Sequence, residues 1–141
     1  MRYDTTVDIA ASPDAVWGVL EDVEAWPRWT RSMTSVRRTA AGHLLPGEHV
    51  KVRQPGLPAA DWTVTAVDPG ASFTWVSKSP GVTTSGTHVV APTASGSRVT
   101  LTIEQHGPLA PLVGVMLGGK TRRFVEIEAA GLRDRLEHET A

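Results

Sequence analysis

Three polar side chains that could bind a ligand or move a proton fall at positions that the hydrophobic pattern places inside the protein. His88 and Gln105 occur on the apolar faces of two alternating segments, and Glu128 follows Phe124 by four residues in a helical apolar stripe. An imidazole can donate, accept or titrate near neutral pH. A carboxyl group among apolar side chains costs free energy unless it is paired or neutral. His88 and Glu128 are therefore candidate catalytic residues for general acid–base chemistry, or candidate polar anchors for a ligand.

These residues also have structural interpretations. His88 is consistent with a core histidine that hydrogen-bonds to the backbone or to a neighbour such as Gln105. Glu128 is consistent with a carboxylate at the helix rim that pairs with an arginine or a lysine. The sequence leaves both interpretations open.

Apolar side chains at matching positions would complete a pocket around the polar ones. Alternation places Trp62 and Trp75 on the inward faces of neighbouring strands, where they form an aromatic wall for a flat apolar ligand or part of an ordinary core. One helical stripe at three- and four-residue spacing contains Val113, Leu117, Thr121, Phe124, Val125, Glu128 and Leu132. The predicted ligand-binding residues are Trp62, Trp75, His88, Gln105, Leu117, Thr121, Phe124 and Glu128.

Several kinds of chemistry are excluded by what the chain lacks. It contains no cysteine, which rules out disulfides, cysteine–zinc sites and thiol nucleophiles. No nucleophile elbow and no phosphate-binding glycine motif occurs, and no set of histidines and acids has metal-ligand spacing, so we expect no metal and no cofactor. A net charge of −1 argues against strong non-specific binding to nucleic acid or anionic lipid.

The elements that would position these residues follow from periodicity and turn chemistry. Residues 2–9 alternate like a half-buried strand, and Ser12-Pro13-Asp14 has the composition of a helix start. In the segment 23–29 we expect Pro27 to break one short helix and to open another. Further strands are predicted at 33–39, 47–54, 61–67, 72–78, 83–91 and 98–106, and a long helix is predicted from Gly107-Pro108 to about residue 137.

This order of elements predicts an α+β fold in one domain over residues 1–141. Consecutive strands with short turns give a curved seven-stranded antiparallel sheet, and the terminal helix is the only element long enough to cover one of its faces. A curved sheet that grips a helix encloses space between the two. We therefore expect a ligand cavity there.

The segments that could cross or enter a membrane are short. The longest apolar run, Leu109–Gly119, is about half of what a membrane span needs, and the N-terminus has no apolar segment typical of a signal peptide. We expect a cytoplasmic protein without integral membrane association, as a monomer or a homodimer. The excess of arginine over lysine and the many alanines are typical of GC-rich bacterial genomes.

The chain resembles the START-like, or SRPBCC, superfamily with its helix-grip fold, and within it bacterial proteins of the polyketide cyclase/dehydrase type. The resemblance covers nearly the whole chain, and it implies a deep hydrophobic cavity between the sheet and the C-terminal helix. No catalytic motif of the superfamily can be placed on this sequence. The segments that carry the resemblance are Ala11-Ser12-Pro13-Asp14-Ala15-Val16-Trp17, Asp22-Val23-Glu24-Ala25-Trp26-Pro27-Arg28-Trp29, Val52-Arg53-Gln54-Pro55-Gly56-Leu57-Pro58, Phe73-Thr74-Trp75 and Gly107-Pro108-Leu109.

Three functions are compatible with the predicted fold, cavity and site residues. The first is binding of a small hydrophobic molecule, such as a polyketide, a lipid or an isoprenoid, with His88, Gln105 and Glu128 orienting it. The second is a polyketide cyclase or dehydratase that folds its substrate in the cavity and moves a proton with His88 or Glu128. The third is a protein-interaction module without a ligand.

Overall fold

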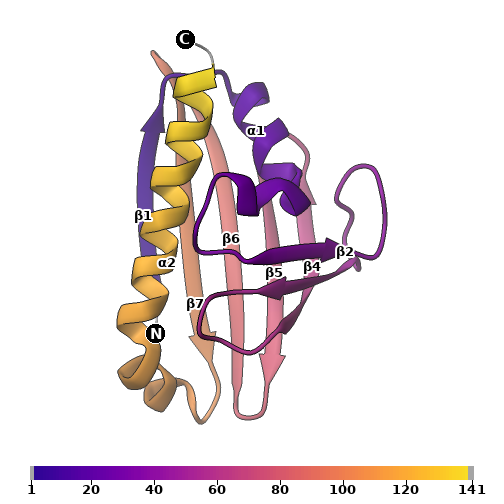
Figure 1. Cartoon of the computed structure of the whole chain (residues 1–141), viewed down its shortest axis with the longest axis vertical. Coiled ribbons are helices and arrows are strands. Elements are labelled where there is room, and N and C mark those ends of the chain that lie inside the picture. The colour runs from indigo at the N-terminus through magenta and orange to yellow at the C-terminus, as the bar shows by residue number, and fades with distance from the viewer. Residues whose placement is uncertain (1, 140–141) are drawn as a thin grey trace.

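Seven strands and three helices make up the structure, a computed structural model that describes residues 2–139. In chain order they are β1 (Arg2–Ile9), α1 (Pro13–Glu21), the 3-10 helix η1 (Val23–Arg28), β2 (Ser35–Arg38), β3 (His49–Arg53), β4 (Ala60–Asp68), β5 (Ser72–Ser79), β6 (Val82–Thr93), β7 (Gly96–His106) and α2 (Ala110–Glu139) (Figure 1). The predicted α+β helix-grip fold is confirmed, and each predicted strand is present. The first residue and the last two of the predicted domain lie outside the described residues.

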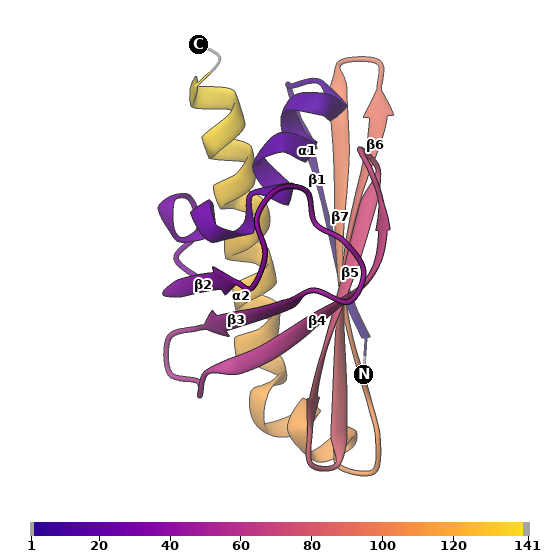
Figure 2. The ribbon, with the colours of Figure 1, turned by 90° about the vertical axis from the view of Figure 1, so that its right-hand side faces the viewer.

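A single antiparallel sheet contains all seven strands in the order β1-β7-β6-β5-β4-β3-β2. Figure 2 shows that β2 and β3 leave the plane of the central strands and reach toward the side on which α2 lies. We call these two strands the β2–β3 arm. At the start of the bend, the pairing of β4 with β5 shifts register between Val64 and Ala66, so that Val67 rather than Ala66 packs against the core.

Local sequence explains how the first helices begin and end. The Ser12 side chain accepts a hydrogen bond from the Ala15 backbone N–H at 3.2 Å and Pro13 occupies the first helical turn, as the sequence predicted. The prediction that Pro27 breaks the next helix was wrong, because η1 is one continuous 3-10 helix with Pro27 inside it. Proline is tolerated here because the helix is so short that only one hydrogen bond is lost.

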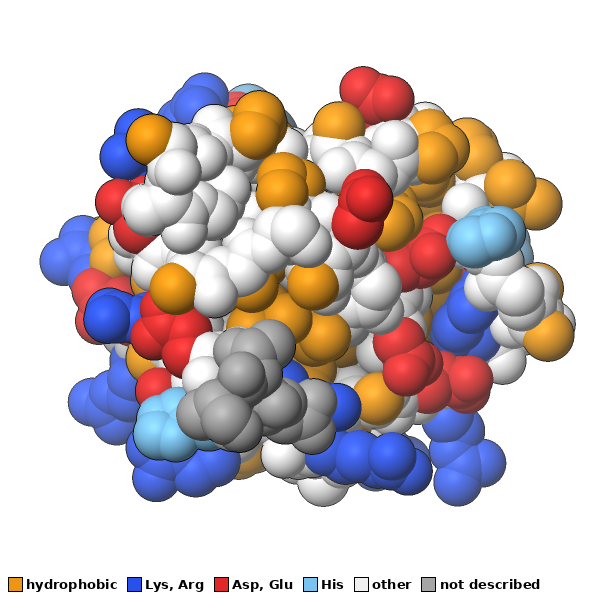
Figure 3. Space-filling view, turned by 90° about the horizontal axis from the view of Figure 1, so that it is seen from above, with side chains coloured by type: hydrophobic (Ala, Val, Ile, Leu, Met, Phe, Trp, Pro, Cys, Tyr) orange, Lys and Arg blue, Asp and Glu red, His pale blue; other side chains and the backbone are white. Residues whose placement is uncertain are grey.

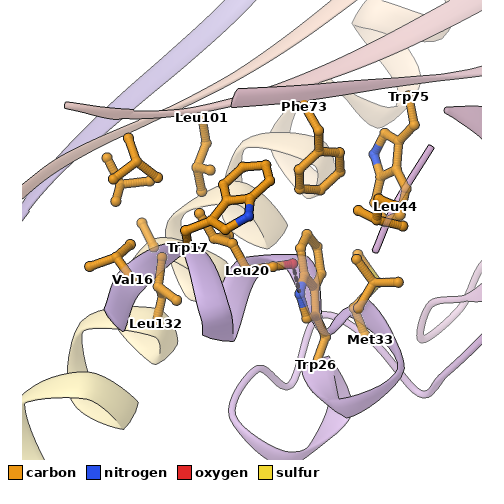
Figure 4. Close-up of a cluster of buried hydrophobic side chains, with 14 of the residues drawn as sticks. Val16, Trp17, Leu20, Trp26, Met33, Leu44, Phe73, Trp75, Leu101 and Leu132 are labelled. Atoms are coloured by element: carbon orange, nitrogen blue, oxygen red, sulfur yellow. Dashed lines mark hydrogen bonds between the residues drawn. The ribbon is translucent and has the colours of Figure 1, made fainter. Parts of the chain in front are cut away.

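The core lies between the sheet and the layer formed by α1, η1 and α2. Figure 4 shows Phe73 and Trp75 pointing from the sheet toward Trp26 and Leu20. Trp26 is fully buried, and its indole N–H donates to the Leu20 carbonyl oxygen at 3.0 Å. This bond satisfies the polar atom of the largest fully buried side chain and fixes η1 against α1.

Polar contacts fasten the middle and the C-terminal end of α2 to β1 and to the residue that follows β1. The Tyr3 hydroxyl donates to Glu126 at 2.6 Å, and this carboxylate raises the pKa of the phenol. Near the C-terminal end, the Ala10 backbone N–H donates to Glu137 at 3.0 Å and lowers the pKa of that carboxyl group. These contacts hold α2 in place across the sheet. Among residues 2–139, no helix combines the length and the apolar character needed to cross a bilayer.

Gly131 lets α2 pass close to the backbone at the end of η1. Because a larger side chain would not fit there, Gly131→Ala is expected to lower the free energy of unfolding by about 1–3 kcal/mol. A Cβ at this position would overlap the Trp29 carbonyl oxygen, which belongs to the backbone and cannot rotate away. The matched control is Gly119→Ala on the same helix, where an added Cβ meets nothing within 4 Å. That change should stabilise the protein by about 0.5–1 kcal/mol. Equal stability of the two variants in urea unfolding would contradict this account.

Candidate functional site

A cavity of about 610 Å³ lies between the concave side of the sheet and α2. Its lining comes from Met33, the β2–β3 arm, the segment 54–62, the strands β5, β6 and β7 with the turn between β5 and β6, and residues 113–128 of α2. We call the exposed part of this lining, together with the half-buried Leu57, the mouth; its exposed residues are Pro58, Ala59, Asp61, Lys78, Ser79, Pro80 and Leu117. The volume falls within the range of about 300–1,000 Å³ that is usual for small-molecule sites.

Two tryptophans form one wall of this cavity. The rings of Trp62 and Trp75 lie 5.5 Å apart between centroids and are tilted by 41°. Trp75 crosses over β6 at Gly86, where any added Cβ would come within 2.9 Å of the indole Nε1. Gly86 therefore creates the space that this indole occupies. The wall offers a broad aromatic surface to a flat molecule.

The polar part of the lining is centred on His88 and Glu128, which are 5% and 8% exposed. The imidazole stacks on the Phe73 ring at a centroid distance of 4.2 Å, and its Nδ1 lies 3.4 Å from the Phe73 carbonyl oxygen. Its Nε2 lies 3.5 Å from Glu128 Oε1. Within the part of the chain that the structure describes, Glu128 Oε1 has no hydrogen-bond partner. A polar group on a ligand could satisfy it.

The structure agrees in part with the structural interpretation of His88 and contradicts that of Glu128. The Phe73 carbonyl faces His88 Nδ1, as expected for a core histidine that bonds to backbone, but the other ring nitrogen points to Glu128. The rim interpretation of Glu128 was wrong, because the residue is buried and no arginine or lysine among residues 2–139 pairs with it. The pair is thus an imidazole and a carboxyl group facing each other inside a cavity. Such a pair can orient a ligand or exchange a proton with it.

All eight predicted ligand-binding residues contribute to the lining of this one cavity. Their alternation and helical spacing bring five elements together, and the set is Trp62, Trp75, His88, Gln105, Leu117, Thr121, Phe124 and Glu128. Leu117 lies at the mouth and is 37% exposed, whereas Trp75 is 3% exposed. Their role in binding stays a prediction.

Sequence reasoning missed the lining residues of the arm, the loops and the strand ends. Ser77 could have been found, because it continues the alternation of Phe73 and Trp75 and is buried. Gln54 likewise continues the alternation of Val50 and Val52. The residues that belong to or follow the bends carry no periodic signal, and they include Met33, Leu57, Pro58 and Asp61. Their position depends on how far the arm curls, which no local pattern encodes.

A buried ion pair holds the β2–β3 arm that carries this part of the wall. The Arg38 guanidinium donates to both carboxylate oxygens of Glu48, at 2.6 and 2.8 Å, and the carboxylate raises the pKa of Arg38. Arg38 also donates to the carbonyl oxygens of Gly42 and His43, so it ties the loop that joins the two strands to the strands themselves.

Comparison with known protein families assigns the chain to one of them. A family model described as polyketide cyclase / dehydrase and lipid transport matches residues 1–137. The chain belongs to this family. No protein of the curated set matches the sequence significantly.

Solved structures with the same fold are consistent with this family assignment. An aromatase/cyclase, Zhui, from a Streptomyces species superposes with a TM-score of 0.80 at 19% identity, covering 100% of this chain and 96% of that one. A norcoclaurine synthase from Thalictrum flavum superposes with a TM-score of 0.78 at 17% identity, covering 100% and 96%. A protein from Thermus thermophilus gives 0.75 at 18% identity, covering 100% and 99%. At these identities, the likeness establishes the helix-grip fold of this polyketide cyclase/dehydrase family member and nothing finer.

Proposed function

We propose that this chain binds one small, flat and largely apolar molecule in the cavity between the sheet and α2. The observation that carries the proposal is the composition of the lining: an aromatic wall of Trp62 and Trp75 faces the apolar stripe of α2. The buried polar side chains of the lining are the His88–Glu128 pair with Gln105 and Ser77. Burial of apolar surface contributes about 25 cal/mol per Å², so most of the affinity would be hydrophobic.

The geometry also restricts the ligand chemistry. A flat ring system or polyene would stack along the tryptophans, and one hydroxyl or similar donor would reach Glu128 Oε1 and satisfy it. Polyketides, lipids and isoprenoid-like molecules with a single polar end fit this description. The family description, which joins polyketide cyclisation, dehydration and lipid transport, is consistent with such ligands.

Native mass spectrometry of freshly purified protein is the direct test. A stoichiometric extra mass that leaves on denaturation, with the formula of a flat apolar molecule, is the expected result. Protein that stays ligand-free and fails to brighten Nile red, an apolar dye that fluoresces when it leaves water, would overturn the proposal.

Thr121→Trp is expected to weaken Nile red binding by about 100-fold, equivalent to about 2.7 kcal/mol. Thr121 lines the cavity from α2, and an indole there would occupy the space in front of the tryptophan wall. The matched control is Ala130→Trp, on an exposed position of the same helix outside the cavity, which should bind the dye like the wild type. Titration of both variants, with circular dichroism to verify folding, gives the comparison. Undiminished dye binding by a folded Thr121→Trp variant would place the binding site elsewhere.

The His88–Glu128 pair favours a second candidate function, a cyclase or dehydratase of polyketide-like substrates. A cavity that folds a flexible chain brings its reacting carbons together, and a buried imidazole–carboxyl pair is suited to proton transfer. The distinguishing measurement is turnover of a poly-β-ketone analogue by the wild-type protein. Binding of the analogue without any turnover would leave the carrier function and exclude the enzyme.

A further inference from the structure

A group of large apolar side chains at the N-terminal end of α2, with Leu109 just before the helix, is exposed in the part of the chain that the structure describes. Val115 is 86% exposed and Met116 71%, with Leu112 at 55%, Leu109 at 46% and Leu117 at 37%. We call these five residues the apolar tip. Five exposed large apolar side chains within nine consecutive residues are unusual on a protein surface, and such patches mark interaction sites.

The charged side chains in and directly after the apolar tip are all basic. Residues 107–125 contain none of the fifteen acids of the chain but include Lys120, Arg122 and Arg123, which directly follow the apolar tip along α2. Of the fourteen lysines and arginines, eleven remain for the rest of the chain, which therefore carries four more acids than bases. At the opposite end of the molecule, acidic and basic side chains are interspersed (Figure 3). The overall charge of −1 thus conceals a segregated basic segment.

We propose that the apolar tip and the three cations after it dock on the surface of an anionic lipid bilayer. The apolar side chains would enter the acyl boundary, and the cations one to two turns away would lie at the level of the lipid phosphates. Buried apolar area and electrostatic attraction to anionic lipids are the two contributions that strengthen binding of a helix in the membrane interface.

The shape of the apolar tip favours a bilayer over a protein partner. Val115 and Met116 lie in the second turn of α2, are 86% and 71% exposed, and do not belong to the lining of the cavity. A protein partner would need a matching cavity for each of these side chains, whereas lipid deforms around them. The cations add charge complementarity to anionic headgroups.

Docking in this orientation would place the cavity mouth at the bilayer. Leu117 belongs both to the apolar tip and to the mouth, and Val113 and Thr121 line the cavity one turn to either side of it. Lys78, at the end of β5, is another mouth residue. This step rests on the proposed function: an apolar ligand would pass between bilayer and cavity without crossing water.

The test measures co-sedimentation of the ligand-free protein with vesicles of seven parts phosphatidylcholine and three parts phosphatidylglycerol, and with vesicles of phosphatidylcholine alone. We expect binding to the anionic vesicles that weakens as salt is added. Val115→Gln with Met116→Gln should reduce it more than tenfold, because the inserted apolar area is lost. Arg122→Gln with Arg123→Gln should reduce it about 25-fold, since each cation near an anionic surface contributes about fivefold.

Matched controls use the same changes elsewhere on the surface. Leu45→Gln alters an apolar side chain that is 65% exposed in the β2–β3 loop, and Arg28→Gln with Arg31→Gln removes two exposed cations next to η1. Both controls should bind vesicles like the wild type. Nile red binding by every variant, in buffer without vesicles, tests the cavity separately, so loss of vesicle binding alone leaves the proposed function intact.

Two results would overturn the docking proposal. One is wild-type protein that does not sediment with anionic vesicles, or that does so equally in all variants. The other is a dimer in light scattering that Val115→Gln with Met116→Gln converts to a monomer, which would assign the apolar tip to a second copy of the chain.

Discussion

Glu48→Ala is expected to lower the free energy of unfolding by about 3 kcal/mol. Its carboxylate accepts two hydrogen bonds from Arg38, and the two side chains are only 3% and 9% exposed. Removing the carboxylate leaves a guanidinium charge in a poorly hydrated place, and breaking such a pair costs more than the pair contributes. The effect lies at the lower end of the usual range because Arg38 borders the exposed segment 40–43, where a small rotation would bring it to water.

Urea unfolding of three variants measures this expectation. Asp8→Ala is the matched control, because the Asp8–Arg98 pair has a similar geometry but side chains that are 63% and 54% exposed; its loss should cost much less than the loss of the buried pair. Replacing both partners, with Arg38→Met and Glu48→Met, should recover most of the stability lost in Glu48→Ala. A cost for Glu48→Ala no larger than for Asp8→Ala would mean that the buried pair does not hold the β2–β3 arm.

The same pair links stability to the candidate site. The arm presents Val52 and the neighbouring Met33 and Gln54 to the cavity. If the arm loosens, this wall moves while the central strands and α2 stay in contact through the core. We therefore expect Glu48→Ala to weaken Nile red binding as well.

The parts of the fold that follow from periodicity were predictable from the sequence. Alternation identified Trp75 and His88 as inward-facing, and helical spacing identified Thr121 and Glu128, because each element has one buried face and repeats with a fixed period. Their convergence on one cavity then follows from a sheet that grips a helix.

The rest depends on curvature, which the pattern does not contain. The register shift between Val64 and Ala66 is caused by a single unpaired residue within β4, and the alternation of that strand does not predict it. Pro27 was misjudged because proline breaks an α-helix but is accommodated in a short 3-10 helix. The partnership of His88 with Glu128 joins residues forty positions apart, and it became visible only with the sheet and α2 in place.

Glu128→Leu is expected to stabilise the fold and to impair recognition. Leucine removes a buried oxygen that has no hydrogen-bond partner among residues 2–139, and we expect the free energy of unfolding to rise by about 1–2 kcal/mol. A residue whose replacement stabilises the protein is a residue retained for function. Thermal and urea unfolding give the first half of the test; a Glu128→Leu variant less stable than the wild type would make the carboxyl group structural.

Ligand selectivity gives the second half. 2-Naphthol and 2-methylnaphthalene have the same flat shape, but only the first donates a hydrogen bond. A buried acceptor left without a partner costs about 1–3 kcal/mol, so the wild type should prefer the naphthol by about tenfold, and Glu128→Leu should abolish that preference while binding the methyl compound unchanged. In Glu128→Gln an acceptor remains, so the preference should persist in reduced form.

If the protein turns over a poly-β-ketone analogue, Glu128→Gln should slow this turnover by about 10²–10⁴-fold, since an amide accepts a hydrogen bond but cannot transfer a proton. Retained selectivity with lost turnover would therefore identify the carboxyl group as an acid or base, and loss of selectivity without any turnover in the wild type would identify it as an anchor.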